Sequence, residues 1–91
     1  MVKLTCNYAE LRFEHIIDFS DRTVFVAARY NGNKVRLFLI YNDTGTIYTR
    51  NGSDRWEQVT DYDAELISTL VAESRARRDI PIYQIHGNHS N

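Results

Sequence analysis

The sequence has few of the residues on which several kinds of protein depend. Its 91 residues include a single cysteine, Cys6, so no disulfide can form within the chain. There are four glycines, and they fit neither a G-x-G-x-x-G loop nor a Walker loop for phosphate. No serine stands in a nucleophile elbow. Disulfide scaffolds and the common nucleotide-binding loops are therefore excluded.

Long apolar runs and a strong net charge are also missing. The longest apolar run, Leu37 to Tyr41, is far shorter than the roughly 20 residues of a membrane-spanning helix. The residues after Met1 contain no apolar core of signal-peptide length, so we expect a cytoplasmic protein without membrane contact. The net charge is −1, so binding to nucleic acid would depend on a local basic patch.

What is present indicates one ordinary folded domain. Hydrophobic residues make up 43% of the chain and charged residues 25%, close to average globular usage. We predict a single α+β domain over 1–85. The polar residues 86–91 are predicted to form a flexible C-terminal tail.

The first pattern is typical of a helix. Asn7 followed three residues later by Glu10 fits a capping box, in which the asparagine side chain accepts a backbone N–H. Apolar residues then recur at helical spacing: Ala9, Phe13, Ile16 and Ile17, with Leu11 and Phe19 widening the face. We therefore predict an N-terminal helix, although the alternation of Leu11 and Phe13 leaves a strand open.

A two-residue alternation follows, which is typical of β-strands. The predicted strands, joined by polar loops that contain glycine, are 23–30, 34–41, 47–50 and 56–59. The first hairpin has two candidate turns: Asn31-Gly32 would pair Ala28 with Val35, and Gly32-Asn33 would pair Ala28 with Leu37. Both registers bring the same aliphatic sides together, so we predict a four-stranded antiparallel meander.

A second helix is predicted after the strands. Thr60 and Asp61 are both suitable N-caps, and a one-sided apolar stripe follows: Leu66, Ile67, Leu70 and Val71. Acidic residues at its start and arginines at its end suit the helix dipole. Pro81 prevents continuation, and alternating apolar residues over 80–85 indicate a possible short C-terminal strand. The predicted fold is α+β: an N-terminal helix, the meander, and a second helix packed on one sheet face.

The loop after the second predicted strand contains Asp43-Thr44-Gly45. This tripeptide is similar to the one that holds the catalytic carboxylate of aspartic proteases, where two carboxylates share one proton. Aliphatic residues directly precede the motif in that family, whereas Tyr41-Asn42 precedes it here. No aliphatic-aliphatic-glycine segment is found, and the likeness covers only three residues. We therefore interpret the tripeptide as a hairpin loop and predict a non-enzymatic protein without catalytic residues.

Metal ligands are sparse. Three carboxylates stand at the start of the second predicted helix: Asp61, Asp63 and Glu65. Acidic residues at a helix start suit the dipole without any metal. His86 and His89 lie three residues apart in the predicted tail, but a structural zinc site normally needs four ligands, so His15 and Cys6 would both have to come from elsewhere in the fold. No neighbouring base activates the Cys6 thiol. We predict neither a metal site nor a cofactor.

The two faces of the predicted sheet differ in composition. The face assigned to the helices is aliphatic: Val24, Val26, Ala28, Val35, Leu37, Leu39 and Ile47. The other face is aromatic and basic, apart from Ile40. Its predicted binding residues are Phe25, Arg29, Lys34, Arg36, Phe38, Tyr48 and Arg50. Two helices are too few to cover both faces, so we expect this aromatic-basic face to remain exposed.

The predicted hairpin registers also place like charges opposite each other. Each places Arg29 opposite another cation, Lys34 or Arg36, and like charges across a strand pair are destabilising. An acidic partner surface would relieve this repulsion. Alternatively, the long basic side chains lie over their aromatic neighbours and keep the face soluble.

These observations favour a small protein-binding module, such as an inhibitor, an antitoxin-like factor or an accessory factor. Aromatic residues and arginine dominate the energetics of protein interfaces. Single-stranded nucleic acid is an alternative, with bases stacked on the aromatic rings and phosphates bound by the basic groups. A small enzyme of unrecognised chemistry is a second alternative, and the same face also suits a homodimer.

Overall fold

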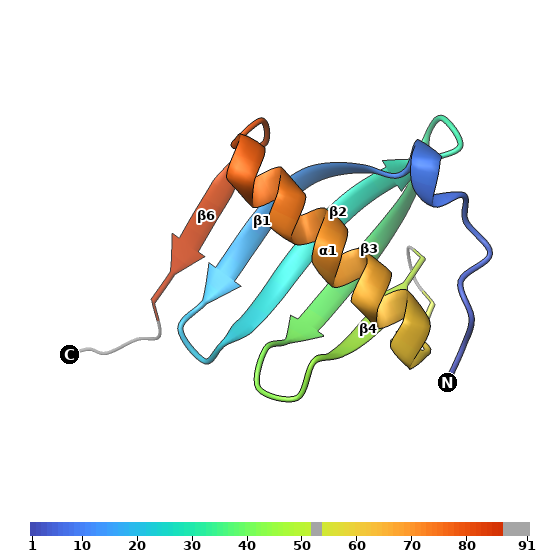
Figure 1. The fold of residues 1–91 in the computed structure, drawn as a ribbon, viewed down its shortest axis with the longest axis horizontal. Coiled ribbons are helices and arrows are strands. Elements are labelled where there is room, and N and C mark those ends of the chain that lie inside the picture. The colour runs from blue at the N-terminus through green and yellow to red at the C-terminus, as the bar shows by residue number, and fades with distance from the viewer. Residues whose placement is uncertain (52–53, 87–91) are drawn as a thin grey trace.

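The computed structural model describes residues 1–51 and 54–86. Six strands form one sheet in the order β5-β4-β3-β2-β1-β6, and helix α1 lies across one of its faces (Figure 1). The elements are the 3₁₀ helix η1 (Tyr8–Glu10), β1 (Arg12–Phe19), β2 (Thr23–Tyr30), β3 (Lys34–Tyr41), β4 (Thr46–Arg50), β5 (Glu57–Gln58), α1 (Asp61–Arg77) and β6 (Ile82–Ile85). The α+β class is confirmed.

The predicted meander is present as β2 to β5, in which each strand is antiparallel to its predecessor. Helix α1 then takes the chain from β5 at one edge of the sheet to β6 at the other (Figure 1). There β6 pairs with β1 in parallel, which requires a crossover of this kind rather than a tight turn. The C-terminal strand predicted over 80–85 is therefore present at the edge of the sheet.

Helix α1 follows the predicted signals closely. Thr60 is its N-cap, and the Thr60 Oγ1 accepts a hydrogen bond from the backbone N–H of Asp63 at 3.3 Å. The buried positions of the helix recur at helical spacing: Asp63, Ala64, Ile67, Val71 and Ser74. The helix ends at Arg77, and its C-cap Arg78 adopts the left-handed conformation with φ 55°.

The predicted N-terminal helix is wrong, because these residues form β1. Asn7 does cap a helix, with its Oδ1 accepting the N–H of Ala9 at 3.0 Å, but that helix is only the three-residue η1. A bulge at Glu14 shifts the register between Phe13 and His15. Phe13 and Ile16 consequently lie on one face at a spacing of three, which imitates the spacing of a helix.

The predicted pairing of the first hairpin is also wrong. The loop has three residues, 31–33, so Ala28 pairs with Arg36 and Val26 pairs with Phe38. Each register predicted from a two-residue turn differs from this one by a single residue, and such a slip turns every side chain of a strand to the opposite face. Phe38 therefore lies in the core at 0% exposure, and Ile40 is also buried.

The core lies between the sheet and α1. Its largest fully buried side chains come from four strands, the helix and the segment before it: Phe38, Ile16, Ile47, Ile67, Val26 and Val59. The N-terminal segment packs along one margin, where Val2 bridges to Val59 in parallel. Of the predicted flexible tail over 86–91, only His86 belongs to the described residues, so that prediction lies outside the part of the chain the structure covers.

Candidate functional site

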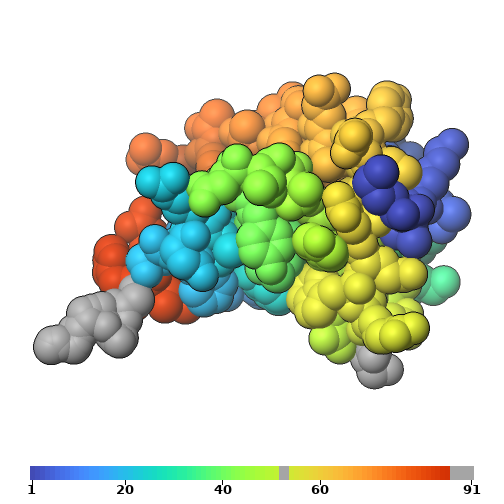
Figure 2. Space-filling view, turned by 90° about the horizontal axis from the view of Figure 1, so that it is seen from below, coloured from blue at the N-terminus to red at the C-terminus, as the bar shows by residue number. Residues whose placement is uncertain are grey.

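Helix α1 covers one face of the sheet, and no described helix covers the other (Figure 2). We call this second surface the open face. Side chains alternate along each strand, so the open face receives the residues between those buried against α1. Its apolar and aromatic members are Ile17, Phe19, Phe25, Ala27, Val35, Leu37, Leu39, Tyr41, Tyr48, Tyr83 and Ile85. A sheet face that meets water normally carries mainly polar residues, whereas most positions of this one are apolar or aromatic.

The structure separates the seven predicted binding residues. Four lie on the open face: Phe25, Arg29, Tyr48 and Arg50. The other three, Lys34, Arg36 and Phe38, lie at positions of β3 that face the α1 side, so their assignment to the binding face is wrong. Val35, Leu37 and Leu39, which were predicted to face the core, take their places on the open face. The one-residue difference in loop length is the reason for all of these exchanges.

Near β4 the open face is hollowed into a groove of about 440 Å³. Its lining residues are Leu39, Tyr41, Thr44, Thr46, Tyr48 and Trp56. The Tyr41 and Tyr48 rings meet edge to face with their centroids 5.7 Å apart. The guanidinium carbon of Arg50 lies 5.5 Å from the centre of the Trp56 ring. The groove thus combines aromatic surface with a cation at its margin.

Of the six lining residues only Tyr48 was predicted as a site residue, and the two other aromatic ones, Tyr41 and Trp56, were missed. Trp56 precedes the short β5, where a two-residue strand gives too little alternation to assign a face. Tyr41 follows the same alternation as Leu39, and the wrong register of β3 concealed its position. The signal that was available is composition, because Trp56 is the only tryptophan of the chain.

Aromatic contacts continue across the open face towards β6. The His15 ring stacks on Phe25 with centroids 6.3 Å apart, and it meets Tyr83 edge-on at the same distance. Tyr83 and Ile85, on the edge strand β6, are among the most exposed large apolar residues. The apolar surface therefore extends from β4 to the opposite edge of the sheet.

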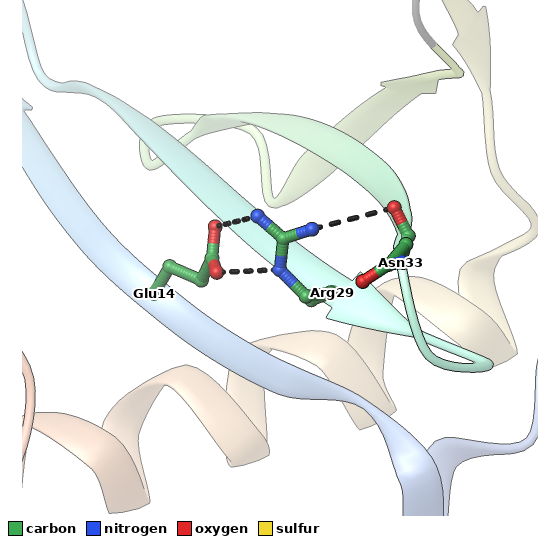
Figure 3. Close-up of polar contacts among 3 residues, drawn as sticks. All are labelled: Glu14, Arg29 and Asn33. Carbon is green, nitrogen blue, oxygen red and sulfur yellow. Dashed lines mark hydrogen bonds and ion pairs between the residues drawn. The ribbon is translucent and has the colours of Figure 1, made fainter.

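The charge of Arg29 on this face is balanced within the chain. Its Nε donates to Glu14 at 2.7 Å, one terminal nitrogen donates to the other Glu14 oxygen at 3.3 Å, and the second donates to the Asn33 carbonyl at 3.3 Å (Figure 3). The Arg29 guanidinium holds the pKa of Glu14 below its usual value. Arg29 lies opposite Val35 on β3 and opposite Arg12 on β1. The predicted pairing with Lys34 or Arg36 is wrong. The acidic group that balances the charge of Arg29 is Glu14 of the same chain.

The Asp43-Thr44-Gly45 tripeptide lies in the loop between β3 and β4, as expected for a hairpin connection. Asp43 is exposed and forms an ion pair with Arg22 at 3.1 Å. Gly45 has φ 75°, a conformation that side chains rarely adopt. In this position the tripeptide forms a turn, and the Asp43 carboxylate is paired with Arg22 of the neighbouring loop between β1 and β2.

The carboxylates at the start of α1 differ in their burial. Asp63 is buried and accepts hydrogen bonds from Leu4 N–H at 3.0 Å, Tyr8 Oη at 2.9 Å and Thr60 Oγ1 at 2.9 Å. Asp61 and Glu65 are exposed. Among the described residues, no three acidic, histidine or cysteine side chains lie close enough together to hold a metal ion.

The thiol of Cys6 is partly buried. Burial raises its pKa, and the nearby positive charge of Arg36 only partly offsets this effect. The group is therefore held as the neutral thiol, which is a poor nucleophile.

The comparisons with known proteins add no identity to this geometry. No protein-family model, no curated protein and no solved structure matches the chain significantly. Within the described residues, no helix combines the length and the apolar character that crossing a bilayer requires.

Proposed function

We propose that this chain is a small protein-binding module that docks on another protein through the open face. The single observation that supports the proposal is the composition of this face. Most of its positions from β4 to β6 are apolar or aromatic, yet no described helix covers them. Contiguous apolar surface of this kind on a small domain marks an interaction site.

The size of the open face suits a specific interface. Six strands about 4.8 Å apart, with eight-residue strands at its centre, give a face of roughly 600 Å². A standard protein interface buries about 800 Å² on each partner. The open face and its rim are therefore large enough for a stable complex, and the groove offers a pocket for one anchoring side chain of the partner.

The charge distribution determines the kind of partner. The case for an acidic partner depended on Arg29 lying opposite another cation of β3, and Glu14 already balances that charge. We therefore propose a partner whose contact surface is mainly apolar, with a polar rim. A factor that inhibits or assists a larger protein, as an accessory subunit or an antitoxin-like protein does, has this requirement.

Nucleic acid fits the open face less well. Lys34 and Arg36 face the α1 side, and Arg29 is engaged by Glu14. Phosphate contacts supply most of the affinity for single strands, so this face lacks the main source of that affinity. Fluorescence anisotropy with mixed-sequence RNA and DNA should show no binding at low salt. Binding that weakens steeply with salt would favour the nucleic-acid alternative instead.

The test of the proposal compares two substitutions of the same kind on opposite sides of the molecule. Leu39→Glu places a charge in the groove, whereas Tyr62→Glu places it on α1 at a side chain that is 70% exposed. Both variants are used, with the unmodified chain, to capture partners from the cells that make the protein. A parallel sample is treated with nuclease.

We expect the unmodified chain and Tyr62→Glu to retain the same partner, and Leu39→Glu to lose it while remaining folded by circular dichroism. A partner that is retained by folded Leu39→Glu would refute docking through the open face. Sedimentation of the unmodified chain at micromolar concentration tests whether the open face binds a second copy of the chain instead. A stable homodimer at that concentration would make the second copy the partner.

A further inference from the structure

A second unusual feature is centred on a residue of the covered side of the sheet. The three-residue loop before β3 turns Arg36 towards the α1 side, where the residue is only 9% exposed. Its guanidinium lies 5.3 Å from the centre of the Tyr30 ring. An arginine is rarely buried to this extent unless a carboxylate or another anion accompanies it.

The protein contacts of Arg36 are few and neutral. One terminal nitrogen donates to Thr49 Oγ1 at 3.3 Å and the other to the Tyr30 hydroxyl at 3.4 Å, both long for hydrogen bonds. The Nε atom is buried and has no hydrogen-bond partner. Buried polar groups in folded proteins are normally satisfied, so an orphan of this kind indicates a bound water, ion or ligand beside it, and the positive charge of Arg36 favours an anion.

No carboxylate of the described residues forms an ion pair with Arg36. The ion pairs found there belong to other cations, namely Arg22, Arg29, Arg75 and Arg77. The buried carboxylate on this side of the sheet is Asp63, and its oxygens accept bonds from Leu4, Tyr8 and Thr60. Among these buried groups, the Asp63 carboxylate therefore has its hydrogen-bond donors, whereas the Arg36 guanidinium lacks an acceptor for Nε.

Arg36 also lines a pocket of about 160 Å³. At about 30 Å³ of liquid volume for each water molecule, this space corresponds to roughly five waters, enough for one small anion. The charged residues of its lining comprise four cations and two carboxylates: Lys3, Arg36, Arg50, Arg55, Asp54 and Glu57. The excess of positive charge in a partly enclosed space favours an anion.

The pocket is built from segments that lie far apart in the sequence. Lys3, Leu4 and Thr5 come from the N-terminal segment, and Thr49 comes from β4. The N-terminal segment is fixed by hydrogen bonds from Val2 N–H to the Gln58 carbonyl at 2.8 Å and from Leu4 N–H to Asp63 at 3.0 Å. An anion here would contact several of these segments together.

We propose that the pocket beside Arg36 binds a small free oxyanion, with a phosphate or carboxylate group as its chemical class. The bound anion supplies the negative charge and the hydrogen-bond acceptors that the Arg36 guanidinium lacks. Arginine suits this task because its planar fork of N–H groups matches the oxygen atoms of such groups. Since the anion binds only the folded chain, it also raises the stability of the fold.

The experiment titrates the purified chain with inorganic phosphate, sulfate or acetate by calorimetry, at an ionic strength held constant with sodium chloride. We expect one saturable site and a melting temperature that rises with the concentration of the bound oxyanion. A response to phosphate and sulfate alone assigns the phosphate class, and an equal response to acetate extends it to carboxylates. Absence of saturable binding for all three, or equal stabilisation by chloride, would overturn the proposal.

Two variants test whether Arg36 is the residue that binds the anion. Arg36→Met removes the guanidinium and keeps a long side chain, and should weaken binding roughly tenfold or more. Arg77→Met removes an equal charge from the exposed last turn of α1 and should leave binding unchanged. Equal affinities in Arg36→Met and the unmodified chain would refute the assignment.

If Arg36→Met does not fold, the unmodified chain still decides the question by nuclear magnetic resonance. Phosphate should shift the backbone amides of Leu4, Thr49 and Asn51, which line the pocket, and leave Tyr83 on β6 unmoved. Shifts confined to other parts of the chain would contradict the proposal. The outcome is independent of the open face, because neither variant alters a residue of that surface.

Discussion

The two faces of the sheet are built from the same strands but have opposite surroundings. Towards α1 the side chains are closely packed, and Val26, Phe38 and Ile47 are fully buried. On the open face Phe25, Leu39 and Tyr48 are only partly buried, although they are no less apolar. The comparison shows that hydrophobicity alone does not identify the core of this protein. The position of α1 decides which apolar face is buried by the chain itself and which is left without a helix over it.

The largest difference between the two faces should appear on truncation of a phenylalanine. Phe38→Ala leaves a cavity in a fully buried site and should lower the free energy of unfolding by about 3–5 kcal/mol. Phe25→Ala, on the open face, should cost about 1 kcal/mol or less. Urea unfolding of both variants measures the two values. Equal losses would mean that the faces are not distinct in the isolated chain.

The next largest effect concerns the buried carboxylate on the covered side. Asp63→Asn keeps the shape of the side chain but removes the charge that accepts three hydrogen bonds, and should cost about 2 kcal/mol. Burial by itself would raise the pKa of Asp63, but the bonds from Leu4, Thr60 and Tyr8 outweigh it and hold the pKa below 3.8.

The pH dependence of this contribution follows from its sign. Because folding lowers the pKa of Asp63, the charged group stabilises the fold fully above its ordinary value of 3.8. The contribution is lost as the pH falls through the lower pKa of the folded state. The free energy of unfolding of Asp63→Asn should therefore fall less steeply at acid pH than that of the unmodified chain. Parallel curves for the two proteins would show that Asp63 is not the group involved.

A smaller effect is expected in the loop that determines which residues of β3 reach each face. Gly32 has φ 79°, and a Cβ atom added there would meet no other atom within 4 Å. Gly32→Ala should therefore cost about 1 kcal/mol through backbone conformation alone. Thermal unfolding measures the loss, with Asn33→Ala as the neighbouring control. A neutral Gly32→Ala would indicate that the loop conformation does not constrain the register.

The smallest effect is expected for the ion pair at the margin of the open face. Glu14→Gln removes an exposed partner of Arg29, and such pairs contribute little because water screens them. The unfolding midpoint should shift slightly at low salt and become indistinguishable from that of the unmodified chain at high salt. A large shift that persists at high salt would mean that this pair is part of the folded core.

The parts of the fold that depend on local signals could be predicted from the sequence. Thr60, the apolar stripe after it and the basic residues at its end determine α1 locally, and each strand of the meander has its own alternation. The bulge at Glu14 and the three-residue loop are different, because each changes a spacing by one residue. Neither change leaves a mark in composition, yet the first imitates a helix and the second exchanges the two faces of β3.

The candidate site was predicted incompletely for the same reason. Phe25, Arg29, Tyr48 and Arg50 were assigned correctly to the face without a helix, since their strands needed no correction of register. The residues taken from β3 were all assigned to the wrong side. The pairing of β3 with its hairpin neighbour β2 decides this side, and the alternating pattern within a single strand does not contain it.

The most direct test of docking through the open face uses its only tryptophan. Trp56 lines the groove, so its fluorescence reports on this surface without a label. When the captured partner is added to the purified chain, we predict a shift of Trp56 emission to shorter wavelength and a loss of quenching by acrylamide. A partner without tryptophan, or one whose tryptophans are replaced, keeps the signal specific. Full binding with unchanged emission and unchanged quenching of Trp56 would contradict the account.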